Sequence, residues 1–128
     1  MSKNHCQRKL GTSTRRAWQE RARAEVLGVV GDTAIGARHL DRLEIVERIL
    51  KESMRLYPPA AVLARTPKAP TTLGGIAYKP GDQLVVPIWS LHRHEALWDD
   101  PGRFDPDRFL PDQKKKQHPF AYLPFGGG

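Results

Sequence analysis

The sequence predicts a mainly helical fold with a small β region, and three observations support this class. Apolar residues recur at helical spacing over residues 16–30 and again over 44–57. Between residues 62 and 88 the pattern changes to short apolar runs separated by turn residues, which is typical of strands. From residue 90 onward aromatic residues alternate with prolines, so we expect little regular structure there.

Two helices are expected in the first half of the chain. The first runs from about Arg16 to Val30 and ends at Gly31-Asp32, and a turn of helix is expected over residues 39–43. The second begins at Asp41 or Glu44 and continues to Tyr57. It cannot extend further, because Pro58-Pro59 lack backbone donors and force the preceding residue out of the helical region.

Three strands are expected next, at residues 62–66, 75–78 and 83–88. The last two are joined by Lys79-Pro80-Gly81-Asp82, which has proline and glycine where a type II turn needs them. We therefore interpret residues 75–88 as a hairpin. Two helices, a small sheet and a long coil give no closed set of layers, so the chain is expected to be part of a larger fold.

Composition excludes several classes of protein. The chain has 128 residues and a single cysteine, Cys6, which rules out a disulfide framework and a multi-cysteine zinc site. One cysteine suits a reducing compartment, and we expect a cytoplasmic protein. No apolar run approaches the length of a membrane span. His92 and His94 have no third ligand at metal-site spacing, so no metal site is expected from the residues present.

The net charge of +7 is concentrated at the N-terminus. Residues 1–24 hold seven basic residues and one acidic residue, whereas residues 25–128 hold 14 basic and 13 acidic residues. Residues 1–15 are therefore expected to form a basic, disordered leader, with a transit peptide as an alternative. Because residues 25–128 are nearly neutral, nucleic acid is not expected as a partner.

Glu52 falls on the packing face of the second expected helix. At about 100° per residue it lies roughly 20° from Ile45, inside the apolar stripe, and Arg55 lies at the edge of the same face. A carboxylate on a packing face is costly unless it is paired and hydrogen-bonded, and Arg55 is the local candidate. Taken alone, this pair could also be an ordinary surface ion pair.

Three ordered motifs extend this interpretation. Glu52-Ser53-Met54-Arg55, followed by Leu56-Tyr57-Pro58-Pro59, resembles the E-x-x-R helix of the cytochrome P-450 superfamily. Phe104-Asp105-Pro106-Asp107-Arg108-Phe109 resembles the meander of that family, and Pro124-Phe125-Gly126-Gly127-Gly128 resembles the opening of its heme-binding loop, F-x-x-G-x-R-x-C-x-G. The resemblance covers about Trp18 to Gly128, so residues 16–128 are expected to form the C-terminal part of the cytochrome P-450 fold.

The resemblance implies roles for five residues. Glu52, Arg55 and Arg108 would form the structural cluster that holds the meander against the helix. Arg65 matches the position from which the family commonly contacts a heme propionate, although it could be a solvent-exposed strand charge. Phe125 matches the aromatic residue near the proximal side of the heme, although it could be a plain core residue. The resemblance assigns no catalytic residue and no metal ligand to this chain.

The family's thiolate ligand would lie four residues beyond Gly128, and we expect a truncated chain that does not bind heme stably. A thiolate matters because it pushes electron density onto iron and favours O–O cleavage. The complete protein is expected to be a heme-thiolate monooxygenase that inserts one atom of O₂ into a small organic substrate. Its electrons would come from a ferredoxin or a flavin reductase. The alternative is a non-enzymatic remnant that binds an acidic partner through its basic N-terminus.

Overall fold

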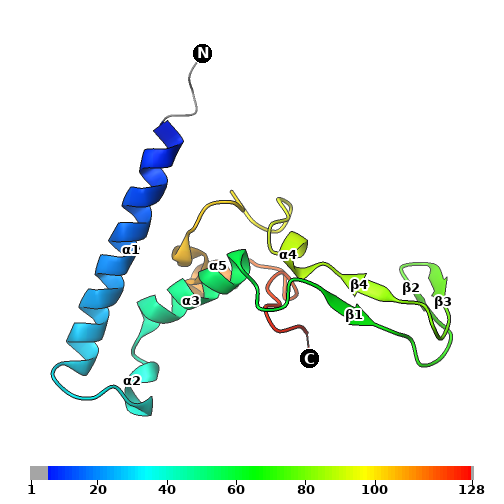
Figure 1. Cartoon of the computed structure of the whole chain (residues 1–128), viewed down its shortest axis with the longest axis horizontal. Helices are drawn as coiled ribbons and strands as arrows, with labels where there is room; N and C mark the ends of the chain where they lie inside the picture. The colour runs from blue at the N-terminus through cyan, green and yellow to red at the C-terminus, as the bar shows by residue number, and fades with distance from the viewer. Residues whose placement is uncertain (1–5, 128) are drawn as a thin grey trace.

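The computed structural model describes residues 6–127, with side chains described from residue 15 onward. Helices make up a larger share of the chain than strands, in agreement with the predicted class. Figure 1 shows α1 at one end of an elongated molecule, α3 near the middle and a β ribbon at the opposite end. The helical elements are α1 (Cys6–Val30), α2 (Ala37–Leu40), α3 (Glu44–Leu56), α4 (Ile88–Leu91), the 3₁₀ helix η1 (Pro106–Phe109) and α5 (Pro111–Lys114). The strands are β1 (Leu63–Arg65), β2 (Thr71–Leu73), β3 (Ile76–Tyr78) and β4 (Leu84–Val86).

Helix α1 ends where the sequence predicts and begins earlier. It stops at Val30, and Gly31 follows in the left-handed region with φ of 61°. Its first residue is Cys6, whereas a start near Arg16 was expected. The expected disorder of residues 1–15 stays a prediction, and residues 1–5 lie outside the described residues. Over the part of the chain that is described, no helix is both long and apolar enough to cross a membrane.

Helix α3 is held at its start by α1. The backbone N–H groups of Ile45 and Val46 donate to the two carboxylate oxygens of Glu25, at 2.8 and 2.9 Å. These N–H groups belong to the first turn and have no partner within the helix, so Glu25 acts as a cap supplied by a neighbouring element. The helix ends at Leu56, one residue before the predicted end and two before Pro58.

The strands pair differently from the predicted hairpin. Strand β3 pairs with β2, and β4 pairs with β1, both in antiparallel register. The Lys79–Asp82 turn does form, with the Asp82 N–H donating to Lys79 O at 3.1 Å, but it connects strands of two different sheets. The sequence analysis missed the strand at residues 71–73. The pair Gly74-Gly75 could have indicated it, because two glycines are typical of a two-residue hairpin turn, and their φ values of 57° and 80° suit such a turn.

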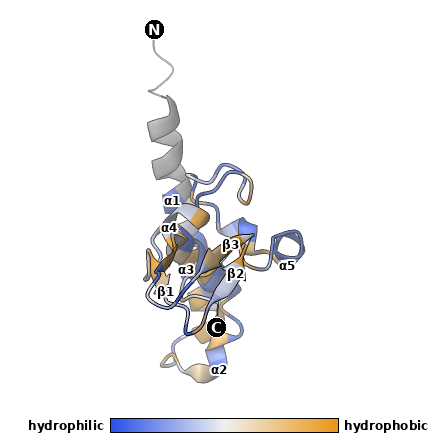
Figure 2. Ribbon diagram, turned by 90° about the vertical axis from the view of Figure 1, so that its right-hand side faces the viewer, coloured by the Kyte–Doolittle hydropathy of each residue, from blue (hydrophilic) through white to orange (hydrophobic). Residues whose placement is uncertain are grey.

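The C-terminal half folds back on α3. Trp98, Phe109 and Ala121 form a buried apolar cluster against which Leu97 and Tyr122 pack. Regular structure is sparse there, as expected, and consists of the single-turn elements α4, η1 and α5. Helix α5 is exposed along its length, and Figure 2 shows it as a hydrophilic element at the edge of the molecule.

Candidate functional site

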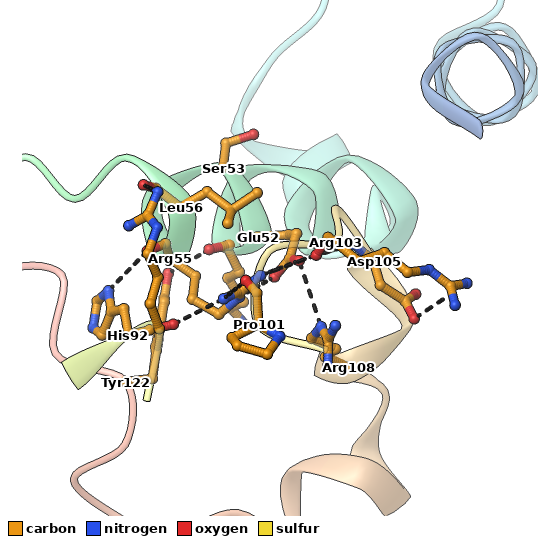
Figure 3. Close-up of polar contacts among 12 residues, drawn as sticks. Glu52, Ser53, Arg55, Leu56, His92, Pro101, Arg103, Asp105, Arg108 and Tyr122 are labelled. Atoms are coloured by element: carbon orange, nitrogen blue, oxygen red, sulfur yellow. Dashed lines mark hydrogen bonds and ion pairs between the residues drawn. The ribbon is translucent and has the colours of Figure 1, made fainter. Parts of the chain in front are cut away.

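Glu52 and Arg55 form an ion pair at the centre of the molecule. Neither side chain is exposed to solvent. Arg55 Nε donates to Glu52 Oε2 at 2.7 Å, and Arg55 Nη2 donates to Glu52 Oε1 at 2.8 Å. This is the bidentate fork-to-carboxylate geometry, the strongest form of a charge-assisted hydrogen bond. Figure 3 shows both side chains projecting from α3 toward Pro101 and Arg108.

Arg55 uses all of its hydrogen-bond donors. Beyond the two bonds to Glu52, it donates to the backbone carbonyls of His92, Pro101 and Arg103, at 2.8, 2.8 and 3.1 Å. A guanidinium has five N–H groups, and each one has a partner here. The three carbonyls belong to the segment between α4 and η1. One side chain of α3 therefore fixes the path of that segment.

Arg108 approaches the same carboxylate from η1. Its Nε lies 3.6 Å from Glu52 Oε1, which is an ion-pair distance but too long for a hydrogen bond. Its Nη2 donates to Asp100 O at 2.8 Å, and the backbone N–H of Asp105 donates to Glu52 Oε1 at 2.8 Å. The structure thus brings Glu52, Arg55 and Arg108 together, and Glu52 lies closer to Arg55 than to Arg108.

A second charged group, which the sequence interpretation missed, joins α1, α3 and η1. Arg48 of α3 donates to a carboxylate oxygen of Asp107, and Arg21 of α1 lies 4.0 Å from the other oxygen. The Arg21 guanidinium also stacks 4.0 Å from the centre of the Trp18 ring. Asp107 lies in the Phe-Asp-Pro-Asp-Arg-Phe motif, so the motif could have suggested this contact, but nothing in the sequence identifies Arg48 as its partner.

Arg65 and Phe125 are both open to solvent. Arg65 is exposed, and its Nη1 donates to the carbonyl of its neighbour Ala64 at 3.0 Å. The Phe125 side chain is 72% exposed. The two residues come from segments that meet at Gly126, where an added Cβ would lie 3.1 Å from Leu63 Cδ1. Gly126 has φ of 94°, so both the space and the backbone favour glycine.

The strand geometry places Arg65 on the side of β1 that faces this loop. Alternate residues of a strand share a face, so Leu63 and Arg65 lie on the same side of β1. Leu63 is opposite Val86 and Arg65 is opposite Leu84 in the pairing with β4. A guanidinium on an apolar strand surface can bind a carboxylate that is attached to a flat apolar group.

His92 is the main residue that the sequence interpretation misjudged. The sequence analysis considered it only as a metal ligand without enough partners, but it follows α4 directly and is fully buried. Its Nδ1 lies 3.1 Å from Arg55 O, and its Nε2 accepts from the Leu123 N–H at 2.8 Å. Its ring stacks on Tyr122, with centroids 5.4 Å apart. Both of its ring partners are backbone groups, and no residue type marks them in the sequence.

Burial shifts the pKa values of His92 itself and of its neighbours Arg93 and Tyr122. Desolvation, together with the Arg55 and Arg93 charges, lowers the pKa of His92 below its usual value of 6.5, although the carbonyl of Arg55 acts in the opposite direction. Desolvation and the charge of Glu52 raise the pKa of Tyr122 to about 12. Desolvation and the Arg55 charge lower the pKa of Arg93, whose guanidinium lies 4.1 Å from the Trp89 ring centre.

No side-chain group suited to a metal ion occurs among the described residues, when groups of at least three His, Cys, Asp or Glu are considered. His94 Nδ1 and His118 Nδ1 accept from nearby backbone N–H groups, of Ala96 and Phe120, each at 3.2 Å. The side chain of Cys6 lies outside the described residues. Arg65 offers an exposed guanidinium that can bind a carboxylate, and Phe125 offers an exposed ring that can pack on an apolar group.

Comparison with known proteins gives a consistent family. Residues 13–128 match the family model "Cytochrome P450". The chain is 43% identical over 115 residues to Cytochrome P450 734A5 of Oryza sativa subsp. japonica, a match that covers 87% of this chain and 21% of that protein. It is 41% identical over 105 residues to Cyclooctatin synthase of Streptomyces melanosporofaciens, covering 82% of this chain and 23% of the relative.

A solved structure agrees with these sequence matches. The heme domain of cytochrome P450DA superposes with a TM-score of 0.80 at 33% identity, covering 90% of this chain and 26% of that chain. The chain spans about a fifth of the length of the curated relatives that it matches. The predicted family and the predicted fold class are thus confirmed.

Proposed function

Because this chain belongs to the cytochrome P450 family, we propose that it forms the heme-side framework of a heme-thiolate monooxygenase. Such an enzyme inserts one atom of O₂ into an organic substrate with electrons from a redox partner, here a ferredoxin or a flavin reductase. The observation that carries the proposal is the approach of Leu63 to Gly126, because it brings together the two segments that carry Arg65 and Phe125. When bound, heme supplies the oxygen-activating chemistry, and the chain's residues bind and orient it.

Arg65 is proposed to donate to a heme propionate. Its guanidinium is exposed and has one hydrogen bond, to an adjacent carbonyl, so a carboxylate can reach it without displacing a buried partner. Two parallel N–H donors match the two oxygens of a propionate. Such a bond contributes about 1.5–3 kcal/mol, or roughly a tenfold to hundredfold change in heme affinity.

Phe125 is proposed to pack against the proximal face of the heme. Its ring is 72% exposed, so a planar apolar group can reach it without displacing another side chain. Covering it with a planar apolar group would remove the ring from water and exclude water from the turn.

Glu52, Arg55 and Arg108 are proposed to have a purely structural role, in which they hold the segment between α4 and η1 against α3.

The proposal is tested by transplanting the segment. Residues 16–128 would replace the corresponding segment of a heme-binding relative such as Cytochrome P450 734A5, to which the chain is 43% identical. We expect the chimera to bind heme and to give the carbon monoxide difference spectrum of a thiolate-ligated heme. A folded chimera without that spectrum would contradict the proposal.

A pair of variants tests the role of Arg65 in the same chimera. We expect Arg65→Gln to speed heme loss to apomyoglobin by about tenfold or more. Arg42→Gln removes the same charge from an exposed position between α2 and α3, and it should leave heme loss unchanged. If the two variants lose heme at equal rates, Arg65 does not bind the heme, even if the chimera does.

A further inference from the structure

The hydrogen bonds of His92 define which ring nitrogen carries the proton. A backbone N–H can only donate, so Nε2, which receives the Leu123 N–H at 2.8 Å, must be an unprotonated acceptor. A backbone carbonyl can only accept, so Nδ1, which lies 3.1 Å from Arg55 O, must carry the hydrogen. His92 is therefore a neutral imidazole with its proton on Nδ1, and both ring nitrogens are used.

His92 is also part of a reciprocal link with α3. Its backbone carbonyl accepts from Arg55 Nη1 at 2.8 Å, while its ring donates to the carbonyl of the same arginine. The ring has no exposure to solvent, and Tyr122 stacks on it at an interplanar angle of 20°. These contacts leave the ring one orientation, which aims Nε2 at the chain segment after Tyr122.

That segment is the turn that leads to Phe125. Leu123 donates its N–H to His92, and its carbonyl accepts from the Gly126 N–H at 3.2 Å, which closes a turn over residues 123–126. Both backbone polar groups of Leu123 are thus committed, one to His92 and one to the turn. Gly126 in turn lies against Leu63 of β1. A chain of contacts runs from α3 through His92 and Leu123 to the place where the loop meets β1.

We propose that His92 is a positioning residue that holds the Leu123–Gly126 turn at a fixed distance from α3, and so sets where Phe125 lies against the heme. The part that concerns heme rests on the function proposed above. The part that concerns the turn stands on the contacts of this chain alone. The ring acts as a rigid spacer between two backbone groups, and it neither touches the reacting atoms nor ligates iron.

The two hydrogen bonds can be separated by substitution. Asparagine places an amide near the position of Nδ1 and can keep the bond to Arg55 O, whereas glutamine reaches toward the position of Nε2 and can keep an acceptor for the Leu123 N–H. Phenylalanine keeps the stacking on Tyr122 and removes both bonds. His94→Gln is the matched control, because His94 is exposed and lies two residues further along the chain.

The experiment measures hydrogen exchange at the Leu123 amide of the 128-residue chain by NMR. We expect exchange about tenfold faster than in the parent for His92→Asn and His92→Phe. It should change by less than about threefold for His92→Gln and His94→Gln. Equal effects for His92→Gln and His92→Phe would overturn the proposal. The ¹⁵N shifts of the parent ring give a check that needs no variant, and a protonated Nε2 at neutral pH would also overturn it.

A heme readout in the chimera separates this proposal from the proposed function. We expect His92→Phe to speed heme loss while His92→Gln and His94→Gln do not. If the parent chimera binds heme and His92→Phe loses it at the parent rate, the positioning role toward heme is wrong and the proposed function stands. If the parent chimera binds no heme, the proposed function fails, and the exchange of Leu123 decides whether His92 holds the turn.

Discussion

Replacing Glu52 with glutamine tests whether the buried ion pair organises this chain. The substitution keeps the shape of the side chain and removes its negative charge. Glu52 Oε2 accepts from Arg55 Nε, and Oε1 accepts from Arg55 Nη2 and from the Asp105 N–H. A glutamine must present an NH₂ group at one of these positions, where it meets donors only. Either orientation therefore breaks at least one bond to Arg55 and leaves a buried cation without its counter-charge.

The expected cost is large for a single substitution. Breaking a buried pair by removing one charge costs about 3–5 kcal/mol, because the remaining charge is uncompensated. We expect the lower end, about 3 kcal/mol, because glutamine keeps part of the hydrogen bonding. A domain is stable by about 5–15 kcal/mol in total, so this loss is a substantial share.

Glu47→Gln is the matched control on the same helix. Glu47 pairs with Lys51 one turn later, and the two side chains are 60% and 28% exposed. Such surface pairs contribute about 0–1 kcal/mol. The same chemical change, in the same element, is therefore expected to cost at least about 2 kcal/mol less at position 47 than at position 52.

Urea unfolding followed by tryptophan fluorescence measures both variants. Trp98 is 3% exposed, and the Arg55 guanidinium lies 5.1 Å from its ring centre, so its emission reports on this region. A Glu52→Gln variant that is already unfolded in buffer, beside a folded Glu47→Gln variant, agrees with the prediction. Equal free energies of unfolding for the two variants would refute the argument that the buried pair organises the fold.

Three further substitutions test neighbouring contacts. Arg55→Lys should destabilise the chain by about 3 kcal/mol or more in the same urea assay, because a lysine cannot replace five directed donors. Glu25→Gln should cost about 1 kcal/mol, measured by the same unfolding, since it weakens the cap that α1 provides to α3. The pKa of His92 is lowered on folding, so its contribution to the free energy of unfolding should be present above pH 6.5 and be lost as the pH falls from there toward the folded pKa. His92→Gln should remove that part of the pH dependence, and an unchanged pH profile would contradict it.

Patterns that depend on neighbouring residues were predictable from the sequence. The end of α3 follows from Pro58-Pro59, and the end of α1 follows from Gly31. The position of Glu52 on the packing face follows from the helical period, and this side chain is fully buried. These features depend on chain stiffness and periodicity over a few residues, which any single sequence displays.

Pairing between distant segments was not predictable in the same way. Proline and glycine at 80–81 correctly indicated a turn, but a turn does not decide which strands it connects. The partner of β4 is β1, which lies about 20 residues earlier and meets it through the register Leu63 to Val86. Strand pairing is decided by side-chain packing across the sheet, and three-residue strands carry too few side chains to specify a partner.

His92 was missed for a different reason, which concerns the kind of partner that it binds. Its ring contacts the backbone groups of Arg55 and Leu123, 37 and 31 residues away. Every residue except proline has a backbone N–H, and every residue has a carbonyl, so no residue type marks these partners in a sequence. Arg55 is a contrasting case, because Glu52 lies one turn away on the same helix and could be recognised from spacing.

Three polar side chains lie in the interior of this chain. Glu52, Arg55 and His92 have no exposure to solvent. Buried polar groups of this kind are tolerated only when their donors and acceptors are matched. All five N–H groups of Arg55 and both ring nitrogens of His92 have partners on α3 or in the chain between α4 and Leu123. Hydrogen bonds are directional, so they specify one path for the chain where apolar contacts would allow several. The segment from α4 to the Leu123 turn is therefore positioned chiefly by two side chains, and the loss of either one should displace it as a unit.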